Sequence, residues 1–105
     1  MFTRHVTMKL KANSAAEFTR VINNEIIPLL RKQKGFRDEI TYVAAERSEA
    51  VANSFWDTKE AAEAYNRTGY PEVLKTLSKV VEGTPTVELF EVATSTCHKN
   101  LAQGA

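Results

Sequence analysis

The stretch VANSFWDTKEAAEAY, residues 51–65, leads from a strand directly into a helix and decides the fold. Its first part, Val51 to Trp56, is a short strand. Asp57 is expected to cap the helix, because Glu60 follows three residues later in the spacing of a capping box. This helix is expected to stop at Gly69. A strand that turns straight into a capped helix predicts a sandwich of helices on a sheet.

Two further strands are expected before this stretch. Residues 2–11 alternate apolar and polar side chains, which is the period of a strand with one buried face; the apolar set is Phe2, Val6, Met8 and Leu10. Residues 36–45 form the next strand, and the polar turn at residues 46–49 joins it to the strand at 51–56. So short a connection predicts an antiparallel hairpin.

A helix with an irregularity is expected between these strands. Ser14 and Glu17 have the capping-box spacing, and Gly35 supplies a left-handed stop after a last turn rich in cations. Inside this helix Pro28 cannot donate a backbone hydrogen bond, so a kink is expected at residues 23–25. The kink has two interpretations: a helix bent around its core, or a bend that opens the helix over a pocket.

The last third of the fold is expected to hold one more helix and one more strand. Tyr70-Pro71 starts the helix, because proline suits the first helical position and disfavours the helical region for the residue before it. Gly83 is expected to end this helix. The final strand covers residues 86–93. The apolar stripe of the helix is Val73, Leu74, Leu77, Val80 and Val81, and the strand presents Val87 and Leu89 on one face with Phe90 and Val92 on the other.

The expected order is therefore β-α-β-β-α-α-β. This order predicts an α+β, ferredoxin-like sandwich in which helices cover one face of a four-stranded antiparallel sheet. We expect one domain over residues 1–94 and a loose tail over residues 95–105. The second face of the sheet carries apolar residues as well as His5, so pairing of two sheets in a homodimer would bury it.

Composition and charge exclude several functional classes. The chain has 105 residues, of which 43% are hydrophobic and 26% charged, and its formal net charge is only +1. Nucleic acid is therefore not an expected partner, since the phosphate backbone calls for a concentrated basic surface. No apolar run approaches the length that crosses a bilayer, and one cysteine excludes an intrachain disulfide, so a cytoplasmic location is expected. The pair Cys97-His98 is too small a set of ligands to predict a metal site.

Several stretches resemble one family. The run at residues 53–61, the Ala64-Tyr65 pair, the run at 69–74 and the sequence LLRKQKGF at 29–36 are similar to the antibiotic-biosynthesis-monooxygenase-like group of dimeric α+β barrel proteins. The resemblance covers residues 2–93 and implies the barrel and the homodimer. The group includes oxygenases that need neither metal nor flavin, haem-degrading enzymes, isomerases and proteins without a known activity.

Six residues are candidates for a site. His5 and Tyr65 are the candidate catalytic residues, because imidazole moves protons near neutral pH and a tyrosine hydroxyl can hold a phenol or quinone oxygen. The candidate substrate-binding residues are Trp56, Tyr70, Tyr42 and Asn53. Each has a structural alternative, in which the aromatic rings pack and His5 is a hydrogen-bonded interface residue. Arg4 is a further polar group able to line a cavity from the sheet.

The resemblance implies a cofactor-independent monooxygenase acting on a small aromatic or polyphenolic compound. Haem degradation is disfavoured, because the first strand has no Asn, and the positions matching the Trp and the haem-ligating His of that branch hold Tyr65 and Leu74 or Lys75. The sequence has no glycine-rich phosphate-binding loop, so a nucleotide cofactor is not expected. The alternatives are a non-catalytic ligand-binding or stress-related protein of the same fold, and an isomerase in which His5 shuttles protons.

Overall fold

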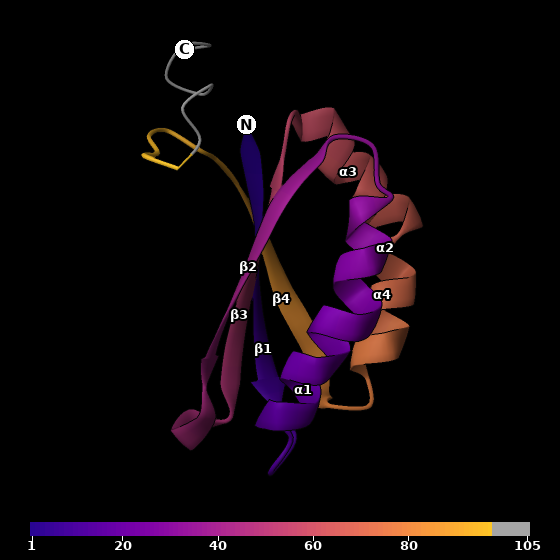
Figure 1. Ribbon diagram of the computed structural model, residues 1–105, viewed down its shortest axis with the longest axis vertical. Helices are drawn as coiled ribbons and strands as arrows, with labels where there is room; N and C mark the ends of the chain where they lie inside the picture. Colours follow the sequence, from indigo (N-terminus) through magenta and orange to yellow (C-terminus); the bar gives the residue numbers. More distant parts are fainter. Residues whose placement is uncertain (98–105) are drawn as a thin grey trace.

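The computed structural model describes residues 1–97, which form one sheet with helices α1 to α4 on one side (Figure 1). The predicted fold class and element order are confirmed. The strands are β1 (Phe2–Leu10), β2 (Phe36–Ala44), β3 (Glu49–Trp56) and β4 (Val81–Glu91). The helices are α1 (Ala15–Val21), a π-helical turn (Ile22–Ile26), α2 (Ile27–Arg31), a 3-10 turn (Ala45–Arg47), α3 (Lys59–Thr68) and α4 (Tyr70–Leu77).

The sheet is antiparallel throughout and has the order β2-β3-β1-β4. The hairpin of β2 and β3 is confirmed, and β1 lies between β3 and β4. Side chains of a strand alternate between the two faces, so Arg4 shares the helix-covered face with Val6, while His5 lies on the other face. We call that other face the open face of the sheet. Its strand registers place His5 opposite Asn53 on β3 and Glu88 on β4.

The core fills the space between the sheet and the helices. Trp56, Phe18 and Leu10 are its largest side chains with almost no exposed surface. Gly35 closes the loop before β2 with a φ of +82°, as predicted, and a Cβ there would lie 2.5 Å from the Cβ of Ala61. Only glycine therefore allows this loop to pack against α3.

The irregularity predicted in the first helix is present as the π-helical turn Ile22–Ile26, directly before Pro28. A π turn adds one residue to a helical turn, and this local widening accommodates the hydrogen bond that proline cannot make. Ile22 and Ile26, at the two ends of the turn, both point into the core and are 5% exposed. The π-helical turn includes residues 23–25, where the irregularity was predicted, and the kink itself stays a prediction.

Both predicted capping boxes are wrong. The N-cap of α3 is Thr58, whose hydroxyl accepts a hydrogen bond from the Ala61 amide at 3.0 Å. Asp57 instead pairs with Arg37, with 3.1 Å between Nε and Oδ1. At α1, Ser14 makes no capping hydrogen bond. Ser14 nevertheless occupies the N-cap position, so this helix starts where it was predicted to start, and Glu17 pairs with Arg20.

The predicted end of the last helix and start of the last strand are also wrong. Helix α4 ends at Leu77, and β4 already begins at Val81, so Gly83 lies within the strand rather than after a helix. Tyr70 is itself the first residue of α4. The pairing of β1 with β4 shifts between Thr7 and Lys9, and the extra residues of β4 form a bulge there. A bulge takes a glycine of positive φ and a proline without ending the strand.

Two features of the ends of the chain complete the description. The predicted tail begins at residue 95, and residues 98–105, including His98 of the Cys97-His98 pair, lie outside the described residues. Val92 donates its amide to the Met1 carbonyl at 2.9 Å, which continues the pairing of the first and last strands. Among residues 1–97, none of the helices has the length and apolar character needed to span a bilayer.

Candidate functional site

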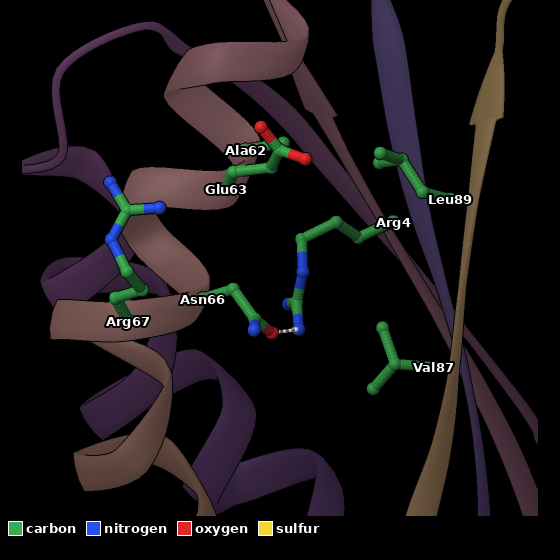
Figure 2. Close-up of a pocket in the computed structure, with 7 residues that line it drawn as sticks. All are labelled: Arg4, Ala62, Glu63, Asn66, Arg67, Val87 and Leu89. Carbon is green, nitrogen blue, oxygen red and sulfur yellow. Dashed lines mark hydrogen bonds between the residues drawn. The ribbon is translucent and has the colours of Figure 1, made fainter.

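A pocket opens between α3 and the helix-facing side of β4, and we call it the outer pocket (Figure 2). Its volume is about 510 Å³, which is within the usual range of small-molecule sites. β4 is the edge strand beside β1, and α3 packs on β1 and β3, so the helix-facing side of β4 stays uncovered. The lining residues are Arg4, Ala62, Glu63, Asn66, Arg67, Val87 and Leu89.

Arg4 forms the floor of the outer pocket. It comes from the centre of β1 and is only 3% exposed. Its Nη2 donates to Asn66 Oδ1 on α3 at 2.8 Å, and Figure 2 shows the two side chains pointing toward one another. Within residues 1–97 no carboxylate lies within 4.0 Å of this guanidinium. A buried cation without a counter-ion is costly, so an anion that entered the pocket would be attracted to it.

Two tyrosine rings pack against the guanidinium of Arg4. Its Cζ lies 4.2 Å from the ring centroid of Tyr70 and 4.9 Å from that of Tyr65. Burial lowers the pKa of Arg4, and the nearby tyrosines partly offset this effect; arginine nevertheless stays charged at neutral pH. The two cation–π contacts supply part of the stabilisation that a counter-ion would otherwise provide.

Burial raises the pKa of both tyrosines, and the charge of Arg4 only partly offsets the shift. Tyr65 and Tyr70 are therefore neutral hydrogen-bond donors at physiological pH and cannot act as bases. The Tyr70 hydroxyl is buried and has no hydrogen-bond partner among the described residues. An unsatisfied buried hydroxyl of this kind costs free energy until a ligand or a water accepts its hydrogen bond.

Trp56 lies deeper than the outer pocket. Its ring stacks on Tyr65 with 4.9 Å between centroids, and Phe36 meets it edge-on at 5.6 Å. Its Nε1 donates to Ser54 Oγ at 2.9 Å, so its one polar group is satisfied. Trp56 thus supports Tyr65 from behind and does not line the outer pocket.

A second, smaller cavity lies on the other side of Arg4, and we call it the inner cavity. Its volume is about 40 Å³. Arg4 and Tyr70 line it, and so does Glu39 of β2, whose carboxylate accepts a hydrogen bond from the Thr41 hydroxyl. Burial raises the pKa of Glu39, and the bond from Thr41 partly offsets this. Arg4 is the residue that the two cavities share.

The other predicted site residues lie on the open face of the sheet. His5 Nδ1 is 2.9 Å from Asn53 Oδ1, and since that oxygen only accepts, Nδ1 carries the proton in this arrangement. Phe90 meets the His5 ring edge-on at 6.1 Å. Tyr42 lies on the same face and is 55% exposed.

The structure therefore divides the six predicted residues between two faces of the sheet. Tyr65, Tyr70 and Trp56 lie together on the helix side, whereas His5, Asn53 and Tyr42 are separated from them by the sheet itself. They do not form a single site, and the individual roles expected of them remain predictions.

Glu39 and Asn66 did not stand out in the sequence. Glu39 reaches the helix side because the pairing of β2 with β3 shifts between Phe36 and Asp38. No residue pattern in the sequence predicts this bulge. Arg4 carried a usable signal. Side chains alternate along a strand, so Arg4 lies on the same face of β1 as Val6 and Met8. The sequence pattern therefore predicts a cation on the core side of the sheet.

The comparisons with known proteins agree with this fold. No protein-family model matches the sequence, and no curated protein matches it. Among solved structures, SnoaB, a cofactor-independent oxygenase from Streptomyces nogalater, is 18% identical, with a TM-score of 0.71 over 90% of this chain and 95% of its own. The monooxygenase ActVA-Orf6 of Streptomyces coelicolor, in complex with nanaomycin D, is 16% identical, with a TM-score of 0.72 over 90% and 88%.

A third match has no assigned activity. NE2512 from Nitrosomonas europaea, a protein of unknown function, is 13% identical, with a TM-score of 0.69 over 90% of this chain and 91% of its own. Identities this low establish the fold and not the activity. The resemblance noted in the sequence is thereby confirmed at the level of the fold: over about nine-tenths of its length, this chain folds as the antibiotic biosynthesis monooxygenases do.

Proposed function

We propose that the outer pocket binds a small, flat phenolic compound as its anion, and that the protein oxidises this compound with dioxygen without a bound cofactor. The observation that carries the proposal is Arg4, a buried guanidinium that faces a pocket of about 510 Å³ and has no carboxylate partner within residues 1–97. Val87 and Leu89 offer an apolar wall for the rings of the ligand.

The chemistry places few demands on the protein. An electron-rich phenol that has lost a proton passes one electron to dioxygen, and the resulting substrate radical and superoxide combine to form a C–O bond. The hydroperoxide, once protonated, then loses water. For a substrate with a reactive methylene group, one dioxygen turns that methylene into a carbonyl and releases one water, so the substrate supplies all the electrons. Stabilising the anion is the step that the protein can accelerate.

The residues divide this task between them. Arg4 would hold the phenolate oxygen, and its charge would lower the pKa of the bound phenol. Tyr65 and Tyr70 would keep the guanidinium in place through their rings. The proton of the bound phenol would leave to solvent through the opening of the outer pocket. Support also comes from the cofactor-independent oxygenase SnoaB and from ActVA-Orf6, whose structure holds nanaomycin D.

Oxygen uptake with a model phenol tests the proposal. With 1,8-dihydroxyanthrone as substrate, the wild type should consume dioxygen and form the anthraquinone in equal amounts, faster than the spontaneous reaction. The Arg4→Met variant should lose about 10- to 100-fold in kcat/KM, the value of a charge-assisted hydrogen bond of about 1.5–3 kcal/mol. The control Arg31→Met removes an exposed arginine outside the pocket and should change nothing. Tight binding of the anthrone without uptake would instead identify a ligand-binding protein.

We further propose that two copies associate through the open face of the sheet. Ile40, Tyr42 and Phe90 are large apolar side chains on this face and are 43%, 55% and 50% exposed. Exposed apolar patches of this kind mark interaction surfaces. The His5–Asn53 pair would lie within this interface as a hydrogen-bonded polar pair and not at the site of chemistry.

A further inference from the structure

The inner cavity has the dimensions of a site for a very small molecule. Its volume of about 40 Å³ exceeds the roughly 10–15 Å³ that a single water needs, whereas a cavity that holds a benzene ring is roughly 150 Å³. It is therefore too small for the ring of a phenolic substrate. It has room for a molecule of two or three heavy atoms.

The lining of the inner cavity favours an apolar occupant. Most of its wall is aliphatic: Val6, Met8, Ile22, Ile26, Val73 and Leu77 are among the lining residues. Four polar side chains also reach the wall: Arg4, Glu39 and Ser54, which bond to Asn66, Thr41 and Trp56, and Tyr70, whose hydroxyl has no partner among the described residues.

The position of the inner cavity links it to the outer pocket. Arg4 lines both, so an occupant of the inner cavity would lie across one side chain from a ligand of the outer pocket. The π-helical turn contributes Ile22 and Ile26 to the wall. This placement supports the second interpretation of the kink, a bend that opens the helix over a cavity.

We propose that the inner cavity is a docking site for dioxygen, which binds there beside Arg4 and reacts once the phenolate occupies the outer pocket. The proposal rests on the proposed oxygenase function and adds the place of the second substrate. Dioxygen is apolar and diatomic, and so matches both the size and the lining. As superoxide develops, the positive charge of Arg4 and the Tyr70 hydroxyl would stabilise it.

Xenon and one cavity-filling variant test this assignment. Crystals of the wild type pressurised with xenon should show one xenon atom among Ile22, Ile26 and Val73. Val73→Ile adds a methylene into the cavity and should abolish this xenon site. With 1,8-dihydroxyanthrone it should raise KM for dioxygen about threefold or more, while kcat and the Kd of the anthrone stay within about twofold. The matched control is Val21→Ile, another buried valine that does not line the cavity; it should keep the xenon site and the wild-type KM.

The outcomes separate this inference from the function on which it rests. An ordered water in place of xenon, or an unchanged KM for dioxygen in Val73→Ile, would overturn the docking site. Neither result would contradict the proposed oxygenase function. If the wild type consumed no dioxygen with any phenol tried, the proposed function and the docking site would fall together.

Discussion

The guanidinium of Arg4 lies 4.2 Å from the centroid of the Tyr70 ring, and the hydroxyl of that ring has no partner among residues 1–97. A buried cation without a carboxylate partner and a buried hydroxyl without an acceptor thus lie side by side at the border of two cavities. Each group would gain from an oxygen that carries negative charge: Arg4 from a phenolate in the outer pocket, and both Arg4 and Tyr70 from superoxide in the inner cavity that they line. The predictions below test this relationship first.

Arg4 is expected to reduce stability rather than provide it. In Arg4→Met a chain of similar length replaces a buried cation, and the free energy of unfolding in urea should stay within about 1 kcal/mol of the wild type or rise. Asn66 is exposed, so water replaces its lost partner. A loss of more than about 3 kcal/mol would show that Arg4 is a structural residue, as removal of one partner from a buried ion pair would be.

Tyr70→Phe removes only the unpartnered hydroxyl. The free energy of unfolding should rise by about 1 kcal/mol, because the folded state no longer buries an unsatisfied polar group. Tyr42→Phe is the control, because that ring is exposed on the open face and its hydroxyl is free to bond water. Destabilisation of Tyr70→Phe by a similar amount would mean that the hydroxyl has a structural partner.

Glu39 gives the stability a pH dependence of known sign. Its pKa is higher in the folded protein than in the unfolded chain, so the folded state binds the proton more tightly. Its contribution to stability is therefore greatest below the unfolded pKa and is lost as pH rises toward the folded pKa. Glu39→Gln should be progressively stabilised relative to the wild type as pH rises above about 4, the ordinary pKa of a glutamate, in urea unfolding.

The comparison variant for this measurement is Glu60→Gln, on the exposed first turn of α3. It should show no such trend from the same cause. A difference between wild type and Glu39→Gln that does not change with pH would refute the raised pKa.

Phe90→Asp should separate the proposed dimer. Sedimentation equilibrium of the wild type should give about twice 11.8 kDa, and the variant should give 11.8 kDa, because a carboxylate on the open face cannot be buried without a partner. Val43→Asp is the control, since Val43 is also exposed but its register partner Ala50 is buried on the helix side. A monomeric wild type at micromolar concentration would contradict the association.

The fold could be predicted further from the sequence than the site. Hydrophobic periodicity located all four strands, and Pro28 indicated where the first helix is irregular, because both are local consequences of backbone and side-chain chemistry. The error at Gly83 has a local cause too. Glycine and proline are found both in turns and in β-bulges, so these residues alone do not distinguish the two.

The composition of the site depended on facts that no local pattern contains. Whether His5 and Tyr65 share a site is decided by which face of the sheet each reaches, and His5 was correctly expected on the second face while Tyr65 belongs to a helix on the first. The bulge that turns Glu39 inward and the approach of Asn66 to Arg4 join residues from separate elements. Such contacts follow from packing, not from spacing along the chain.

The most direct test of the central claim is an anaerobic titration of 1,8-dihydroxyanthrone into the protein at neutral pH, followed by the absorption of the ligand. Without dioxygen no turnover occurs, so the spectrum reports only the protonation state of the bound phenol. Binding to the wild type should produce the spectrum of the phenolate, and binding to Arg4→Met should produce that of the neutral phenol with a weaker Kd. A neutral spectrum on the wild type, or the same phenolate spectrum on both proteins, would contradict the role of Arg4.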